Sequence, residues 1–195
     1  MSLFQSFCVT NQQITLFCCA SMLLVVTATA HAADTAVDCK ALYQQHLKTD
    51  LQLPYAQFDQ TEEQGFRPLA ALQCDKEAAD LIEAYIAKNK ATQSSLRWHI
   101  AQMRAMSGDY PNAIRYANSV LNAQEDFSKN PLRWNDYVKA TIAFLERDRK
   151  ALQYHRDQVA AAKAEHFGNE LNAKLLDALL KHFDQDYRYA TSHID

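Results

Sequence analysis

Residues 94–124 read SSLRWHIAQMRAMSGDYPNAIRYANSVLNAQ, and this stretch carries the clearest fold signal in the chain. At its centre, Gly108-Asp109-Tyr110-Pro111 indicates the end of one helix and the start of another, because glycine tolerates a left-handed cap and proline fits a first helical turn. The small and apolar residues that follow have the i, i+1, i+4, i+7, i+8 spacing of one helix face. They are Ala113, Ile114, Ala117, Val120 and Leu121. The stretch therefore predicts two helices joined by a tight turn.

The same face recurs before and after this stretch at an interval of 35–38 residues. Upstream, all five equivalent positions are small or apolar: Ala78, Ala79, Ile82, Tyr85 and Ile86. Downstream, three of the five remain so: Ala151, Leu152, His155, Gln158 and Val159. Independently, Leu96-Arg97-Trp98 recurs 36 residues later as Leu132-Arg133-Trp134. Two features that share one interval predict an array of helix pairs.

One unit of this array also carries a family resemblance. The stretch containing Trp98, Gly108-Asp109-Tyr110, Ala113-Ile114 and Tyr116 resembles a tetratricopeptide repeat (TPR). Such repeats have a bulky residue early in the first helix, a Gly-Asp-Tyr turn, and alanine where the helices cross closely. The resemblance implies an all-α fold: a short stack of antiparallel helix pairs, in a TPR-like right-handed solenoid, whose first helices line a concave groove. Neighbouring repeats bury each other's apolar face, so the ends need capping helices.

The resemblance differs between the three units. It is closest over 94–124. Over 59–90, Gln73-Cys74-Asp75 takes the place of the glycine turn. Over 131–164 it is poorest, because Glu146-Arg147-Asp148 contains no glycine.

Helices outside these units are expected to cap the stack. We expect one at about 35–48 and a final one at about 169–183. The final helix has apolar residues at helical spacing: Leu171, Leu175, Ala178, Leu179 and Phe183.

The beginning of the chain indicates export. Residues 1–33 contain no Asp, Glu, Lys or Arg, and the apolar run 16–26 has only 11 residues. At about 1.5 Å per residue this run is too short for a hydrocarbon core of roughly 30 Å. Ala30-His31-Ala32 then has the small-x-small form that signal peptidase reads. We predict a cleavable signal peptide over 1–32, a single TPR-like helical domain over 33–195, and a periplasmic or extracellular location without membrane insertion after cleavage. Because no Lys or Arg precedes the run, a retained anchor is the alternative.

Cleavage would leave two cysteines, Cys39 and Cys74. A pair of cysteines in an exported chain favours a disulfide, because an oxidising compartment crosslinks paired thiols. Two free, buried thiols are the alternative, since sequence alone does not show that the two positions meet.

Composition restricts the class of partner. The chain has 20 Lys+Arg against 23 Asp+Glu, a net charge of −3, which gives no electrostatic reason to expect nucleic acid. With 3 Gly and 4 Pro there are too few turn-formers for an all-β fold.

The sequence contains no Gly-rich phosphate loop, nucleophile elbow, His-Glu-x-x-His or cysteine cluster. We therefore expect no cofactor, no resident metal and no catalytic residue. Three possible ligands within residues 182–186, at His182, Asp184 and Asp186, could hold a divalent ion. A solvated helix end, with His182 favourably placed against the dipole, is the preferred interpretation.

The scaffold that the resemblance implies is a binding architecture, so we expect the partner to be another protein or a peptide. Trp98 and Trp134 are expected in the core, because large aromatic side chains are mostly buried. The expected exposed contacts are Arg97, Gln102, Arg133 and Asp136.

Two other function classes stay open. A small exported enzyme would need a site assembled from His99, His155 or Asp136, which spacing does not reveal. A structural or chaperone-like subunit is the third class. A deep polar pocket gathering a histidine and a carboxylate would favour the enzyme, whereas an exposed apolar groove would favour the other two.

Overall fold

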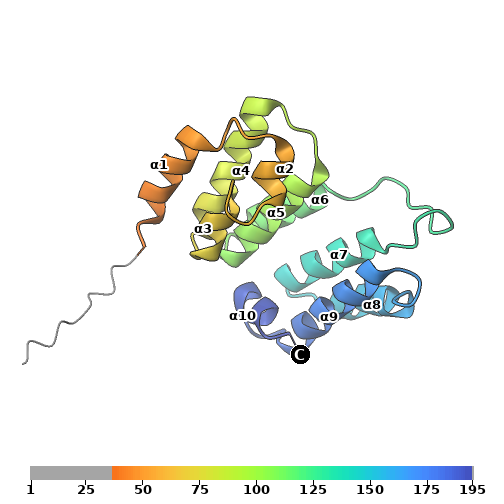
Figure 1. The fold of residues 1–195 in the computed structure, drawn as a ribbon. Coiled ribbons are helices and arrows are strands. Elements are labelled where there is room, and N and C mark those ends of the chain that lie inside the picture. Colours follow the sequence, from red (N-terminus) through yellow and green to blue (C-terminus); the bar gives the residue numbers. More distant parts are fainter. Residues whose placement is uncertain (1–36, 195) are drawn as a thin grey trace, which may run out of the picture. The chain divides into compact units, whose positions relative to one another are not determined.

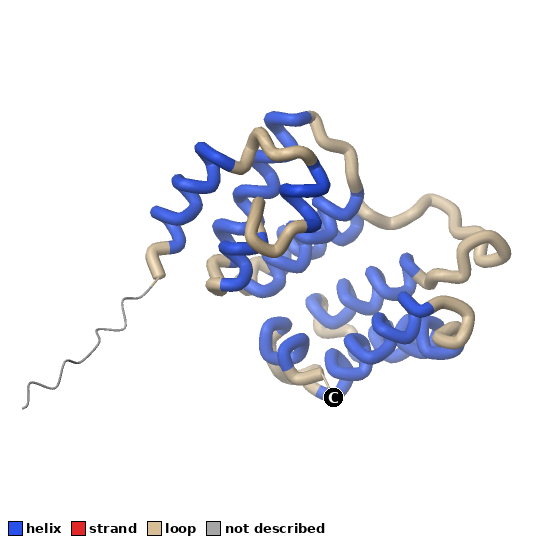
Figure 2. The backbone as a smooth tube through the Cα atoms, viewed as in Figure 1, coloured by secondary structure: helices blue, strands red, loops and turns tan. Residues whose placement is uncertain are grey.

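The structure, a computed structural model, describes residues 37–194, and within that range it contains helices and no strand (Figure 2). This confirms the all-α fold class. The helices, labelled in Figure 1, are α1 Cys39–Thr49, α2 Tyr55–Gln60, α3 Arg67–Ala71, α4 Asp75–Asn89, α5 Ser94–Met106, α6 Tyr110–Asn118, α7 Trp134–Leu145, α8 Arg149–Ala161, α9 Phe167–Lys181 and α10 Tyr187–Ser192.

The predicted signal peptide, 1–32, and its cleavage site lie outside the described residues. Of the helices in 37–194, none combines the length and the apolar character that a membrane span requires.

The helix–turn–helix predicted for 94–124 is present as α5 and α6, which pack against each other. Gly108 lies in the turn with a φ of +80°, in the left-handed region that favours glycine. The Asp109 side chain caps α6 by accepting a hydrogen bond from the Asn112 amide. Ala113 and Ala117, on the predicted apolar face, are fully buried. The close helix contact thus depends on two small side chains.

The turn between α7 and α8 is built without glycine. Arg147 occupies the left-handed region there, with a φ of +62°. Its guanidinium Nη1 donates to the carbonyl oxygens of Phe183 at 2.5 Å and Gln185 at 2.8 Å. The Asp148 side chain then caps α8. These bonds offset the cost of a side chain in this conformation and tie the turn to the segment after α9.

The helix expected before the Gln73-Cys74-Asp75 turn is interrupted, so a regular helix pair over 59–90 is not formed. It is replaced by α2 and α3, which are joined by a turn containing Gly65. Gly65 has a φ of +63°, and a Cβ atom added there would lie 1.9 Å from the Phe58 carbonyl oxygen. The backbone folds onto Phe58 at this point, which a continuous helix would not allow. The second helix of this unit, α4, begins directly after the turn, as predicted.

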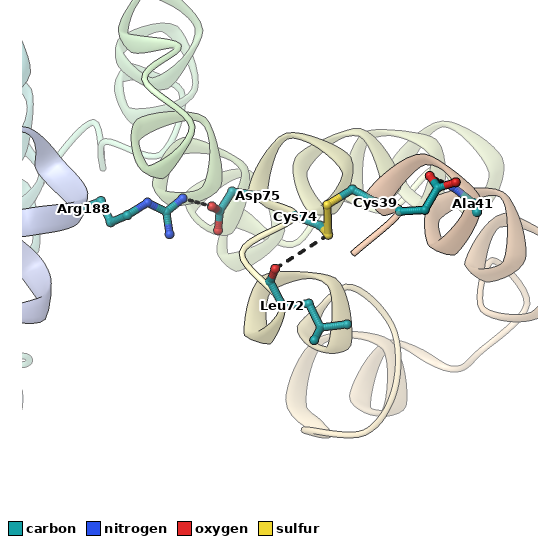
Figure 3. The surroundings of a disulfide bond; sticks show 7 residues. Cys39, Ala41, Leu72, Cys74, Asp75 and Arg188 are labelled. Carbon is teal, nitrogen blue, oxygen red and sulfur yellow. Dashed lines mark hydrogen bonds and ion pairs between the residues drawn. A yellow bond between two sulfur atoms is a disulfide. The ribbon is translucent and has the colours of Figure 1, made fainter. Parts of the chain in front are cut away.

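The predicted disulfide is confirmed. Cys39, the first residue of α1, is bonded to Cys74, which immediately precedes α4, and their Cα atoms are 5.3 Å apart (Figure 3). The bond fixes α1 against α3 and α4, with which α1 packs.

The expected final helix is α9, which packs against α7 and α8. A further short helix, α10, contacts both α9 and α5. Arg188 of α10 pairs with the buried carboxylate of Asp75 at the start of α4 (Figure 3). The Tyr187 amide donates to the Tyr110 hydroxyl at 3.2 Å. Helix α10 is therefore bonded to α4 and to α6, which belong to the two earlier units.

Two apolar clusters form the core. One lies among α2–α5 and includes Phe58, Leu69 and Ile82. The other extends from α5 to α10 and includes Trp98 and Phe144. Helix α5 contributes side chains to both clusters and therefore connects them.

Candidate functional site

A pocket of about 550 Å³ lies between the beginning of α5, the loop from α6 to α7, and the beginning of α7. Its apolar part is formed by Trp98, Leu132 and Trp134. Its polar part carries hydroxyl, amide and charged side chains: Ser94, Ser95, Asn122, Gln124, Glu125, Asp126, Lys129 and Asn130.

The two tryptophans of the chain meet at this pocket. Their ring centroids are 5.4 Å apart and the rings are nearly perpendicular, at 72°. Trp98 is 6% exposed and belongs to the core, as predicted, whereas Trp134 is half-buried and packs against it. The Trp134 Nε1 donates to the Val120 carbonyl oxygen at 2.8 Å. Both rings are therefore fixed before any ligand arrives.

The polar wall is fixed by two hydrogen bonds between Asn122 and Asn135. The Asn122 amide donates to Asn135 Oδ1, and Asn135 Nδ2 donates to the Asn122 carbonyl oxygen, both at 2.8 Å. Glu125 Oε1 accepts from the backbone amide of Asn135 at 2.9 Å. This amide lies in the first turn of α7, where it has no partner within the helix. Glu125 thus caps α7 from the loop and holds its own carboxylate at the pocket.

The rim of the pocket carries an ion pair between Asp126 and Lys129. Asp126 Oδ1 accepts from the Ser128 hydroxyl at 2.6 Å, and Asp126 Oδ2 lies 3.0 Å from the Lys129 ammonium. Hydrogen bonds from Ser128, and then from Lys129, lower the pKa of the Asp126 carboxyl. The carboxylate therefore stays ionised to lower pH than an isolated aspartate.

The far end of the loop is held by Asn169 of α9. Its Oδ1 accepts from the Arg133 amide at 2.8 Å, and its Nδ2 donates to the carbonyl oxygens of Pro131 and Ala162, each at 2.9 Å. Asn169 is fully buried, and all these bonds satisfy its side chain. The loop that shapes the pocket is consequently anchored at both ends.

The four predicted contact residues lie outside this pocket. Arg97 is half-buried and donates to the Thr92 carbonyl oxygen at 3.1 Å. Gln102 is half-buried on α5. The Arg133 guanidinium lies 3.8 Å from the Phe127 ring centroid, and Asp136 accepts a hydrogen bond from His155. None of the four lines this pocket, and Arg133 and Asp136 each contact another side chain of the same chain.

Two of the histidines considered for an enzyme site, His155 and His99, pair with carboxylates, as His46 does with Asp50 at 2.7 Å. His155 Nδ1 lies 2.8 Å from Asp136 Oδ1, and His99 Nδ1 lies 2.7 Å from Asp59 Oδ1. Asp59 is fully buried. Burial would raise the pKa of its carboxyl, but hydrogen bonds from His99, Tyr55 and Gln60, together with the attraction to His99, lower that pKa below its ordinary value. Both histidines are mostly buried and hydrogen-bonded, and neither lines the pocket.

One hydrogen bond connects the pocket to the buried pair. The Ser95 hydroxyl, on the pocket wall, lies 2.8 Å from the Tyr55 hydroxyl. Tyr55 in turn hydrogen-bonds the Asp59 carboxyl. Helices α2 and α5 are therefore joined by two polar contacts, one turn apart, as well as by apolar packing.

Two of the three possible metal ligands at 182–186, His182 and Asp186, make other contacts. The Asp186 carboxylate caps α10 by accepting from the Tyr189 amide at 2.7 Å. The His182 ring packs edge-on against Tyr189 and His193. Within residues 37–194, no group of three or more His, Cys, Asp or Glu side chains is arranged to hold a metal ion.

Asn122, Glu125 and Asn135 are the residues that the sequence did not single out. The available signal was the polar stretch 122–130, which follows an expected helix and precedes the Leu132-Arg133-Trp134 recurrence.

The chain matches no known protein-family model, no curated protein and no solved structure.

Proposed function

We propose that the chain is an exported protein-interaction module on a TPR-like stack, and that its pocket binds a segment of another protein or a peptide. The observation that carries this proposal is the pocket formed by Trp98 and Trp134 with a fixed polar wall. Tryptophan is enriched among the residues that dominate binding energy. The pocket lies at the beginnings of α5 and α7, the first helices of consecutive units, on which the TPR resemblance locates its binding groove.

Preorganisation supports the proposal. Trp134 is bonded to Val120, and Glu125 and Asn122 are bonded to Asn135. A site that is ordered in the free protein loses less conformational entropy when a ligand binds. The hydroxyl and amide groups on the wall can hydrogen-bond an extended peptide backbone. A volume of about 550 Å³ suits one side chain with its flanking main chain.

The Cys39–Cys74 bond supports the proposed export, because structural disulfides persist in oxidising compartments. The signal peptide has its own test. Intact mass of the exported protein should correspond to a chain beginning at Ala33, and a membrane-bound chain retaining Met1 would contradict it.

The interaction is tested by affinity capture from the exported fraction, using the full chain with a C-terminal tag. Ser94 is exposed on the pocket wall, so Ser94→Arg should fill the pocket with little effect on stability. Ser107→Arg is the matched control, at an exposed serine beyond the other end of α5. A partner should be captured by the wild type and by Ser107→Arg but not by Ser94→Arg. Equal capture by all three would contradict binding at this pocket.

A second candidate function, a small exported enzyme with a histidine–carboxylate site, is favoured by the His155–Asp136 pair. A carboxylate on Nδ1 fixes the imidazole for use of Nε2 as a base. Turnover of chromogenic ester, peptide or phosphate substrates should then be lost in His155→Asn. A structural or chaperone-like subunit would instead be recovered in a fixed ratio with its partner.

A further inference from the structure

We infer that the pocket receives a cation, namely the lysine or arginine side chain of the bound segment. This inference rests on the proposed function, because it assigns the chemistry of that same pocket.

The charge of the pocket wall is negative. Among the lining residues of the described chain, two carry carboxylates, Glu125 and Asp126, and one carries an ammonium group, Lys129. The Lys129 ammonium is paired with Asp126 at 3.0 Å, so the Glu125 carboxylate is not neutralised by it. A site with this balance attracts positive groups and repels a carboxylate or phosphate.

Glu125 is held in place as a recognition group. Its Oε1 accepts from the Asn135 amide at 2.9 Å, which orients the carboxylate without removing its charge. Glu125 is also half-buried, unlike the exposed Asp126. A charge that is partly withdrawn from water and already oriented interacts more strongly with an incoming ion than a mobile surface charge does.

The tryptophans favour a cation over an anion. The Trp134 N–H is donated to Val120, so it is not available to a ligand that requires a donor. The Trp134 indole lines the pocket, and tryptophan is the aromatic residue that attracts cations most strongly. Trp98 provides a second indole next to it.

The rim already holds an ammonium group of this chain. Lys129 is 84% exposed at its side chain, and its partner Asp126 is 53% exposed. Ion pairs with this much exposure contribute little to stability. A lysine or arginine from a partner can therefore replace Lys129 at Asp126 while it contacts Glu125 and the indoles, and Lys129 competes with it.

The test uses the intrinsic fluorescence of the full chain, because its only two tryptophans both line this pocket. The probes are acetyl-Gly-Gly-Lys-Gly-Gly-amide and the same peptide with norleucine or glutamate in place of lysine. The lysine peptide should give a saturable change. Norleucine, of similar length but uncharged, should bind about tenfold more weakly, and glutamate should not bind.

Two substitutions separate charge from structure. Glu125→Gln keeps an oxygen that can accept from the Asn135 amide but removes the charge, and should weaken lysine-peptide binding about tenfold. Lys129→Gln removes the competing ammonium and should strengthen it. Glu146→Gln, at an exposed position between α7 and α8, is the control and should leave binding unchanged.

Equal affinity for the lysine and norleucine peptides, wild-type affinity in Glu125→Gln, or weaker binding in Lys129→Gln would each overturn the inference. The proposed function is tested separately by capture. A partner lost in Ser94→Arg, without binding of the lysine peptide, would overturn the cation site and leave the interaction module. Binding of the lysine peptide without a captured partner would leave the cation site and overturn the interaction module.

Discussion

The guanidinium of Arg188, on the last described helix, is paired with the carboxylate of Asp75, the first residue of α4 (Figure 3). Asp75 is 4% exposed and directly follows the disulfide cysteine Cys74. Arg188 Nη2 also donates to the Met106 carbonyl oxygen at 3.0 Å, at the end of α5. One side chain near the end of the chain therefore joins α4, α5 and α10, and the stability of these parts should be coupled.

Arg188→Ala should lower the free energy of unfolding by about 1–3 kcal/mol, because it leaves the buried Asp75 carboxylate without its charged partner. Lys150→Ala, at an exposed position, is the control and should change it by less than about 0.5 kcal/mol. Urea unfolding followed by circular dichroism measures both. If the two variants unfold alike, α10 does not stabilise the earlier helices.

The Cys39–Cys74 bond should stabilise the chain by about 3–4 kcal/mol, because it closes a long loop in the unfolded state. Thermal melts with and without reductant measure this difference, and thiol titration of the unreduced exported protein should find neither cysteine free. Cys39→Ser combined with Cys74→Ser should melt like the reduced wild type and should not respond to reductant. Two titratable thiols would contradict the bond.

Ala113→Leu and Ala117→Leu should each destabilise the chain by about 1–3 kcal/mol. Both alanines are fully buried where α6 packs on its neighbours, so extra carbon atoms must displace backbone or strain rotamers. Arg97→Ala should change the free energy of unfolding by less than about 0.5 kcal/mol, because its hydrogen bond to the Thr92 carbonyl oxygen is exposed. Thermal melts of the three variants decide this. Alanine variants that melt like the wild type, with a collapsed Arg97→Ala, would refute the helix-pair register.

The lowered pKa of Asp59 makes part of the stability depend on pH. A carboxyl whose folded-state pKa lies below its unfolded value of about 4 stabilises the fold above that pH, and this contribution is lost as pH falls through the folded-state pKa. Urea unfolding between neutral pH and about pH 2.5 should therefore show a shallower acid loss in Asp59→Asn than in the wild type. Asp184→Asn, at an exposed position, should follow the wild type. Identical slopes for all three would contradict the role of Asp59.

The sequence predicted those elements whose signals are local. The Gly108 turn, the buried Ala113 face and the final helix follow from spacing and composition, whereas the pair of cysteines favoured the disulfide without showing that the two positions meet. The turn at Gly65 could not be predicted, since a glycine in a helical segment does not show that the backbone folds onto Phe58. The positive φ of Arg147 was equally hidden, because it depends on carbonyl groups 36 and 38 residues away.

The pocket could not be predicted for a related reason. Its wall depends on Glu125 capping a helix that begins nine residues later, and on Asn169 holding the other end of the loop from α9. Periodicity identifies the helices that such residues connect but not the hydrogen bonds between a loop and a distant helix. Arg133 and Asp136 were predicted to be exposed because periodicity does not show contacts between elements. Their partners, Phe127 and His155, lie on other elements.

Photocrosslinking in living cells tests most directly whether a partner protein binds at the pocket. A photoreactive phenylalanine analogue is placed at Gln124, which is exposed on the pocket wall, or at Gln57, which is exposed on α2 and outside the pocket. We predict a discrete adduct with one partner from position 124, none from position 57, and loss of the adduct when Ser94→Arg is added. No adduct from position 124, or the same adduct from both positions, would contradict it.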